Sequence, residues 1–122
     1  MPHRLRLRSI IAPVADLAAA RKWYSEWLGL EPYFDQPFYV GFDVNGFELG
    51  LHPASSAHQP GRDGGVAYWK TPDLDAEWKD VLARGGSELS APRDVGGGVR
   101  VAQALDPFGN AIGLIEERGT HA

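Results

Sequence analysis

Apolar and polar positions along the chain follow two patterns, and each pattern predicts a different element. Between Ser9 and Gly29 a short β-branched run leads into apolar residues at helical spacing, which predicts a strand followed by a helix. Asp16 stands where this helix should begin, as an N-cap, and Gly29 stands where a left-handed residue should end it. Pro13 interrupts the strand, so we expect this strand at a sheet edge or at a bulge.

The same unit returns between Val66 and Gly86. Asp73 matches Asp16, and Gly86 matches Gly29, at one constant offset along the chain. A repeat of this kind indicates a fold built from copies of one module. The pattern therefore predicts an α+β protein made of two strand–helix–strands modules.

Further strands are predicted in the first module by alternation of side chains. Arg4 to Arg8 alternates Arg and Leu, as a half-exposed strand does. Phe38–Val44 and Phe47–His52 are predicted as a hairpin, because Asn45-Gly46 between them is the favoured dipeptide of a two-residue turn.

In the second module the last two strands are predicted at Val99–Leu105 and Ala111–Glu116, joined by a tight Pro- and Gly-containing turn. A short strand is expected within Ser87–Asp94. Asp94–Gly98 contains three successive glycines, so we expect a mobile loop there.

The chain is long enough for one domain, which we expect to span residues 1–122. Module one is predicted at about 1–53 and module two at about 65–118. Residues 54–64 between them are rich in Pro, Ser and Gly, which is typical of a linker.

Composition excludes several classes of protein. Hydrophobic residues make up 43%, enough for a packed core, and the net charge of −4 without a basic run disfavours a nucleic-acid interface. Cysteine is absent, which excludes disulfides, thiolate metal sites and a cysteine nucleophile. No apolar run reaches the roughly 20 residues of a membrane span, and the N-terminus has no apolar signal-peptide core. We therefore expect a cytoplasmic protein that binds neither nucleic acid nor membrane.

Taken together, four segments resemble the glyoxalase/bleomycin-resistance/dioxygenase superfamily, also called the vicinal oxygen chelate fold. They cover nearly the whole chain and read PVADLAAARKWYSEWLGL, KTPDLDAEWKDVLARGG, PRDVGGG and LDPFGNAIGLIE. The resemblance implies two βαβββ modules whose curved mixed sheets surround a pocket, with the helices outside. It also implies a homodimer, as in the antibiotic-binding members.

The resemblance also implies where a divalent metal would be held. The corresponding positions are Ser9, Val66, Gly113 and, depending on the alignment of the hairpin turn, Glu48 or Gly50. At least three of the four positions therefore lack a His or Glu ligand. Because a catalytic ion needs about three protein ligands, we expect no metal and no other cofactor.

The histidines do not offer an obvious replacement site. His3 and His121 lie near the ends of the chain, and His58 lies in the linker. Glu48 and His52 share one face of a predicted strand, but four residues separate them by about 13 Å. We therefore predict that these residues do not converge on one ion.

We take the residues at the family's metal positions to face the pocket, and every second residue along each strand to face it with them. The pocket surface predicted in this way is largely apolar with a few polar groups, which is typical of a small-molecule site. Because the glycines on this surface have no side chains, we expect them to leave open space for a ligand. No Ser-His-Asp set or paired carboxylates can be assembled on it, so no catalytic residue is predicted. The predicted ligand-binding residues are Ser9, Tyr39, Glu48, Gly50, His52, Tyr68, Lys70, Gln103 and Gly113.

Simpler interpretations exist for several of these residues. Tyr39 and Tyr68 can pack against each other, and Lys70 near Glu48 can form a solvated ion pair of little energetic value. His52 can be a polar residue at a strand end.

The favoured hypothesis is a metal-free protein that binds a small molecule, similar to the antibiotic-sequestering members of the family. One alternative is a metal-dependent enzyme of the glyoxalase or dioxygenase type with non-standard ligands. A second alternative is a binding protein that senses a metabolite.

Overall fold

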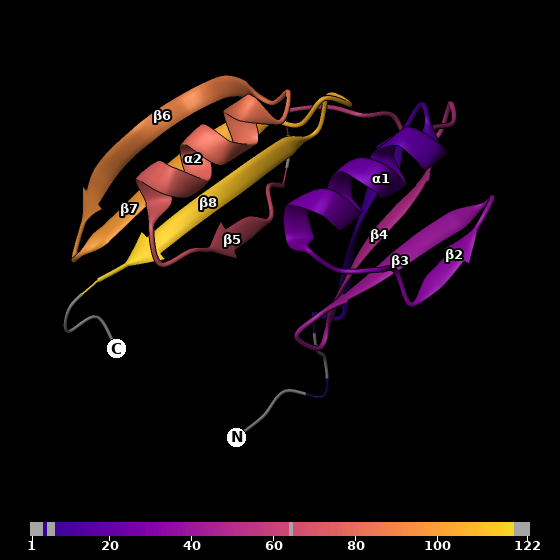
Figure 1. Cartoon of the computed structure of the whole chain (residues 1–122), viewed down its shortest axis with the longest axis horizontal. Helices are drawn as coiled ribbons and strands as arrows, with labels where there is room; N and C mark the ends of the chain where they lie inside the picture. The colour runs from indigo at the N-terminus through magenta and orange to yellow at the C-terminus, as the bar shows by residue number, and fades with distance from the viewer. Residues whose placement is uncertain (1–3, 5–6, 64, 119–122) are drawn as a thin grey trace. The chain divides into compact units, whose positions relative to one another are not determined.

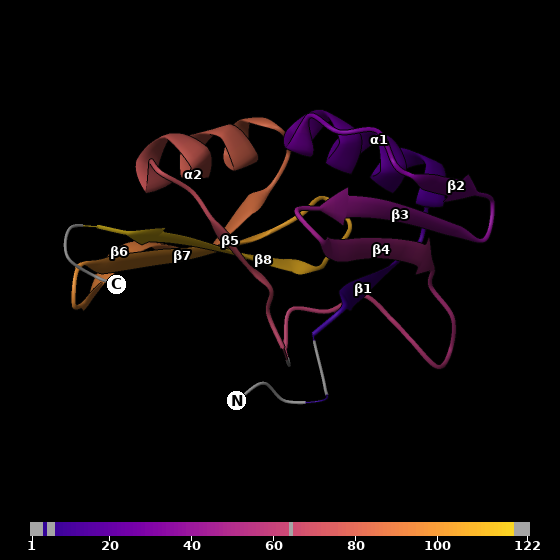
Figure 2. The same cartoon turned by 90° about the horizontal axis from the view of Figure 1, so that it is seen from below.

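Each half of the chain folds into one helix and one four-stranded sheet (Figures 1 and 2). The structure, a computed structural model, describes residue 4, residues 7–63 and residues 65–118. The chain divides into two units, Met1–Pro60 and Gly61–Ala122, and each unit contains one copy of the repeat found in the sequence. Neither helix of the described residues is long and apolar enough to cross a membrane.

The elements of the first unit are β1 (Ser9–Val14), α1 (Leu17–Leu28), β2 (Phe34–Gln36), β3 (Tyr39–Val44) and β4 (Phe47–Pro53). Its sheet has the strand order β1-β4-β3-β2. β1 is parallel to β4, and the other neighbouring strands are antiparallel. β1 lies at the sheet edge, as the proline at position 13 predicts.

The second unit repeats this topology, with the strand order β5-β8-β7-β6 and a parallel pair of first and last strands. Both units are therefore βαβββ modules, which confirms the predicted α+β fold. The elements are β5 (Tyr68–Lys70), α2 (Leu74–Ala83), β6 (Ser87–Gly96), β7 (Val99–Leu105) and β8 (Ala111–Glu117).

Both helices begin at the predicted aspartates. The carboxylate of Asp16 accepts the N–H of Ala19 at 3.0 Å, and Asp73 accepts the N–H of Ala76 at 3.1 Å. Each bond satisfies a donor that the first helical turn would otherwise leave without a partner. Local sequence is therefore enough to fix where both helices start.

The helix ends differ between the units. Gly29 is left-handed with φ 68°, as predicted, but α2 ends earlier than its repeat partner, and the left-handed residue there is Gly85 with φ 98°. The predicted stop at Gly86 is therefore wrong. A Cβ at Gly86 would lie 2.8 Å from the side chain of Val81, so this glycine allows a close approach to the helix.

Two further predictions about local structure are wrong. Arg4, Leu7 and Arg8 are not in a strand, because β1 begins at Ser9; residues 5 and 6 of the predicted strand lie outside the described residues. The segment Asp94–Gly98 does not form the predicted loop, since β6 continues to Gly96 and residues 97 and 98 make a tight turn with φ 65° and 79°.

Each helix covers one face of its own sheet (Figure 2), and alternate strand residues pack beneath it. Among the described residues of each unit, no helix lies on the opposite face of its sheet. The buried apolar side chains of the first unit are Val14, Ala20, Tyr24, Val40, Phe42, Leu49 and Leu51. Those of the second unit are Leu74, Trp78, Val81, Ala102, Ala104, Ile112 and Leu114.

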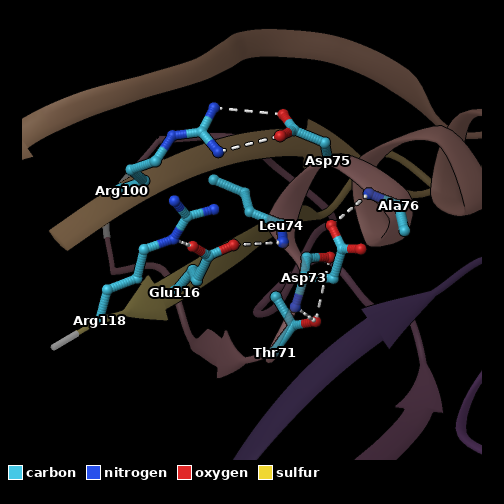
Figure 3. A network of polar contacts seen from close by, with 8 residues as sticks. All are labelled: Thr71, Asp73, Leu74, Asp75, Ala76, Arg100, Glu116 and Arg118. Atoms are coloured by element: carbon cyan, nitrogen blue, oxygen red, sulfur yellow. Dashed lines mark hydrogen bonds and ion pairs between the residues drawn. The ribbon is translucent and has the colours of Figure 1, made fainter. Parts of the chain in front are cut away.

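A buried carboxylate supports the start of α2 (Figure 3). Glu116 on β8 is 2% exposed, accepts the backbone N–H of Leu74 at 2.7 Å and is ion-paired with Arg118. Beside it, Arg100 makes two bonds to Asp75, at 3.0 and 3.2 Å, and these bonds lower the pKa of that carboxyl. Negative charge at a helix N-terminus is favourable, because it faces the positive end of the helix dipole.

We expect Glu116→Gln to lower the free energy of unfolding by about 1–3 kcal/mol, because the hydrogen bond from Leu74 and the pair with Arg118 then lose a charged acceptor. Glu117→Gln is the matched control. Glu117 is the next residue on β8 and pairs with Lys70 at 3.1 Å on the surface, where such a pair contributes about 0–1 kcal/mol. Urea denaturation measures both changes, and equal losses would contradict a special role for Glu116.

Candidate functional site

The helix-free face of the first sheet carries Glu48, Gly50 and His52. They alternate along β4 with Leu49 and Leu51, which are 5% and 0% exposed and pack on the helix side. This is the alternation predicted from the sequence.

Glu48 is the centre of a polar cluster on this face. Its carboxylate accepts hydrogen bonds from the hydroxyls of Tyr33 and Tyr39, one on each oxygen, and lies 3.4 Å from the guanidinium of Arg8. Glu48 is only 9% exposed. Its strand neighbour on β1 is Ser9, so the predicted Ser9, Tyr39 and Glu48 belong to one region of the sheet.

The glycines of this face lie beneath tyrosine rings. A Cβ at Gly50 would overlap the hydroxyl of Tyr39, and a Cβ at Gly41 would lie 3.1 Å from the ring of Tyr33. The backbone pairs Gly41 with Gly50 on adjacent strands, so the two rings cover neighbouring positions. The expectation that these glycines leave open volume is therefore wrong, because aromatic side chains fill the space.

These contacts shift the ionisation of all three groups. Hydrogen bonds from Tyr33 and Tyr39, and the charge of Arg8, lower the pKa of Glu48 below its usual value of 4.5. Burial and the bond to Glu48 raise the pKa of Tyr39 far above 10, and the bond to Glu48 also raises the pKa of Tyr33. The cluster thus favours an ionised carboxylate held by two neutral hydroxyls.

The second sheet has a similar contact built from different strands. Tyr68 on β5 covers Gly113 on β8, where a Cβ would lie 2.7 Å from the tyrosine ring. The side-chain amide of Gln103 on β7 donates to the hydroxyl of Tyr68 at 2.6 Å. The tyrosine is 44% exposed, so its outer surface remains accessible.

The remaining predicted residues find other partners. His52 contacts the ring of His58 at 2.9 Å between nitrogens, and Lys70 forms an ion pair with Glu117 at 3.1 Å. The partner suggested for Lys70 from the sequence was Glu48, which is instead bound by tyrosines and an arginine of its own unit.

The strand registers show which residues of the two modules are equivalent. Ile11 pairs with Gly50 across β1 and β4, and Tyr68 pairs with Gly113 across β5 and β8. Ile11 and Tyr68 precede their helix caps by the same number of residues. Gly50, and not Glu48, is therefore the counterpart of Gly113.

This equivalence bears on the metal that the resemblance implies. The four corresponding residues are then Ser9, Gly50, Val66 and Gly113, and the two glycine positions are covered by tyrosines. Within the parts of the chain that the structure describes, no three or more His, Cys, Asp or Glu side chains are grouped to hold an ion. His3 and His121 lie outside those residues. The side chains at the family's positions do not fit a metal.

Sequence reasoning missed three residues of these clusters. Tyr33 lies in the connection after α1, Arg8 precedes the first strand, and His58 lies in the predicted linker. Tyr33 is placed by its N–H, which donates to the carbonyl of Gly41 at 2.9 Å. Tyr33 and His58 lie outside the predicted strands, so alternation gave no signal for them. Arg8 was predicted at the end of a separate strand, which gave no reason to place it beside Glu48.

We expect Glu48→Gln to lower the free energy of unfolding by about 1–3 kcal/mol near neutral pH, because a charged acceptor of hydrogen bonds is lost. Since folding lowers the pKa of Glu48, its contribution is present above about pH 4.5 and disappears as the pH falls through the lower folded-state pKa. Urea denaturation of both proteins between about pH 6 and pH 3 measures this change.

The matched control for Glu48 is Glu26→Gln, on the exposed side of α1. This change should leave the free energy of unfolding within about 0.5 kcal/mol of wild type at each pH. A gap between wild type and Glu48→Gln that stays constant down to the lowest pH would contradict the assignment.

Comparison with known proteins places the chain among relatives of the same architecture. A structure from Sphaerobacter thermophilus is 25% identical, with a TM-score of 0.74, and the match covers 93% of this chain and 98% of that one. A glyoxalase/bleomycin resistance protein from Catenulispora acidiphila is also 25% identical, with a TM-score of 0.67 and coverage of 93% and 100%. A protein from Agrobacterium tumefaciens reaches a TM-score of 0.80 at 21% identity, with coverage of 94% and 99%.

No curated protein is similar to this chain in sequence. The model of the Glyoxalase/Bleomycin resistance protein/Dioxygenase superfamily, however, matches residues 6–114, which is most of the chain. This match agrees with the two βαβββ modules of the fold, and the protein belongs to the Glyoxalase/Bleomycin resistance protein/Dioxygenase superfamily.

Proposed function

We propose that this protein binds a small amphipathic molecule without a metal at the positions that other family members use. The observation that carries the proposal is the tyrosine ring held on a glycine in each sheet, Tyr39 on Gly50 and Tyr68 on Gly113. These contacts place aromatic surface where the family's enzymes carry metal ligands. Aromatic rings with a few fixed polar groups are typical of sites for small organic molecules.

The tyrosines are well suited to contact a flat apolar group. Tyr68 is fixed beneath by Gly113 and at its hydroxyl by Gln103, yet it is 44% exposed. A ring held in place before binding loses little conformational freedom when a ligand stacks on it. In the first unit Tyr33 is 58% exposed and provides a comparable surface.

Charged groups close to these rings would orient the polar end of the ligand. Lys70, in the same strand as Tyr68, is 70% exposed along its side chain. The side chain of Arg8 is 66% exposed, although it lies 3.4 Å from Glu48 and also interacts with the hydroxyl of Tyr33. Within the first unit, Ser9, His52 and Glu48 are the other polar residues that we propose for ligand binding.

The proposal includes antibiotic sequestration by a cytoplasmic homodimer as its specific form. The support is family membership together with relatives named as bleomycin resistance proteins. A metabolite-sensing role would use the same ligand site. The identity of a bound ligand distinguishes the two.

After mild chelation, the purified protein should carry no stoichiometric Zn, Fe, Ni or Mn. The reason is that a catalytic ion needs about three protein ligands, whereas Gly50, Val66 and Gly113 supply none. Elemental analysis by mass spectrometry measures the metal content. One ion per chain that survives chelation would favour the metal-dependent enzyme instead.

For a ligand found by a thermal-shift screen of amphipathic drugs and metabolites, Tyr68→Ala should weaken binding by about 10- to 100-fold. Burial of roughly 100 Å² of ligand on one ring contributes at most about 2.5 kcal/mol, and stacking adds about 0.5–1.5 kcal/mol. Tyr68→Phe keeps the ring and should lose much less. Calorimetric titration measures the affinities.

Phe47→Ala provides the matched control, because Phe47 is an aromatic residue of similar exposure, 56%, beside the hairpin turn and outside both tyrosine–glycine contacts. Its affinity for the ligand should equal that of wild type. Equal affinity in wild type and Tyr68→Ala would show that Tyr68 does not contact the ligand. It would contradict the proposal that this face of the second sheet binds the ligand.

A further inference from the structure

Two imidazole rings meet where β4 ends, two residues along the strand from Gly50. Nε2 of His52 lies 2.9 Å from Nδ1 of His58, and the ring centroids are 5.0 Å apart with the planes tilted by 35°. His58 is exposed and His52 is half-buried. Imidazole nitrogens are common ligands of transition metals, so the pair is a candidate metal chelate.

The backbone holds His58 in this position. Ser55 and His58 exchange two backbone hydrogen bonds, of 3.0 and 3.1 Å, in an isolated β-bridge. The side-chain amide of Gln59 donates to the carbonyl of Ser55 at 2.8 Å. The N–H of Ala54 donates to the carbonyl of Val14 at 2.8 Å, which ties the start of this turn to the sheet. The two rings therefore approach each other on a closed turn.

The separation of the two nitrogens, 2.9 Å, is that of a hydrogen bond between the rings, and an ion held by both nitrogens would replace that bond. Metal–imidazole bonds are about 2.0–2.1 Å long, so two of them at an angle of about 90–110° hold the nitrogens about 2.9–3.3 Å apart. The nitrogens are therefore close enough to share one ion after a small rotation of the rings. Imidazole nitrogens suit copper, nickel and zinc ions.

We propose that His52 and His58 form a reversible two-imidazole site for a divalent transition-metal ion, with Cu²⁺ bound more tightly than Ni²⁺ or Zn²⁺ and water in the other positions. The order of the ions follows the general affinity series of divalent metals. His52 and His58 are not at the positions that the family's enzymes use for a metal. This proposal does not rest on the proposed function, although His52 also belongs to the proposed ligand-binding residues.

Binding requires a rearrangement of one proton. In the free pair one of the two facing nitrogens donates a hydrogen bond to the other, so only one of them presents a lone pair. When the ion binds, that proton leaves the facing nitrogen and the ring's other nitrogen takes up a proton from solvent. Both rings stay neutral, both facing nitrogens donate lone pairs, and no net proton is released.

The test is a calorimetric titration of the full chain with Cu²⁺ in a buffer that does not bind metals, together with electron paramagnetic resonance. Wild type should bind one ion per chain at this pair, with hyperfine coupling to two imidazole nitrogens. His52→Ala and His58→Ala should each weaken binding by at least about tenfold, since each removes one of two protein ligands. The double variant should be little worse than either single variant, because one remaining imidazole cannot chelate.

The control is a variant with His3→Ala and His121→Ala, which removes the chain's other histidines. It should bind Cu²⁺ as wild type does. The proposal is overturned if this control abolishes binding, if the losses of the two single variants add up in the double variant, or if the double variant binds like wild type. Circular dichroism of each variant verifies that the fold is retained, and a substitution of either histidine by Gln replaces any variant that fails to fold.

Discussion

A glycine directly beneath a tyrosine ring is the contact on which the helix-free face of each sheet depends. Since a Cβ at Gly50 or Gly113 would overlap the ring, the ring can lie against the strand only where the side chain is absent. The ring position then determines where the hydroxyl points. In the first unit it reaches Glu48, and in the second it meets Gln103. Burying the charged carboxylate of Glu48 costs free energy, which the hydrogen bond from a second tyrosine, Tyr33, and the ion pair with Arg8 offset.

The sequence was sufficient for features that depend on residues close together in the chain. The Asp16 and Asp73 caps, the Asn45-Gly46 hairpin and the side-chain alternation of β4 are local, and the structure has them as predicted. Features that depend on the register between neighbouring strands could not be predicted from the sequence. The bond between Gln103 and Tyr68 joins β7 to β5 across β8, and alternation alone could not show which residues of these strands are neighbours.

The two modules share a topology but support their helices differently. The first turn of α2 contains two acidic residues and receives the carboxylate of Glu116 from β8, whereas the first turn of α1 contains no acidic residue. By the register equivalence of Gly50 and Gly113, the counterpart of Glu116 on β4 is Pro53, which has no carboxylate. A repeated backbone therefore does not require repeated side-chain chemistry, provided that the apolar face under each helix is retained.

The tyrosine–glycine contact also has a consequence for how such a chain can evolve. A carboxylate at Gly113 has no room while Tyr68 occupies the space above it, so a substitution there is unfavourable until the tyrosine has been lost. The tyrosine in turn can change first without any clash. The order of the two mutations is thus constrained, and a chain that carries the ring would acquire a glutamate at position 113 only through an intermediate that has neither the ring nor the carboxylate.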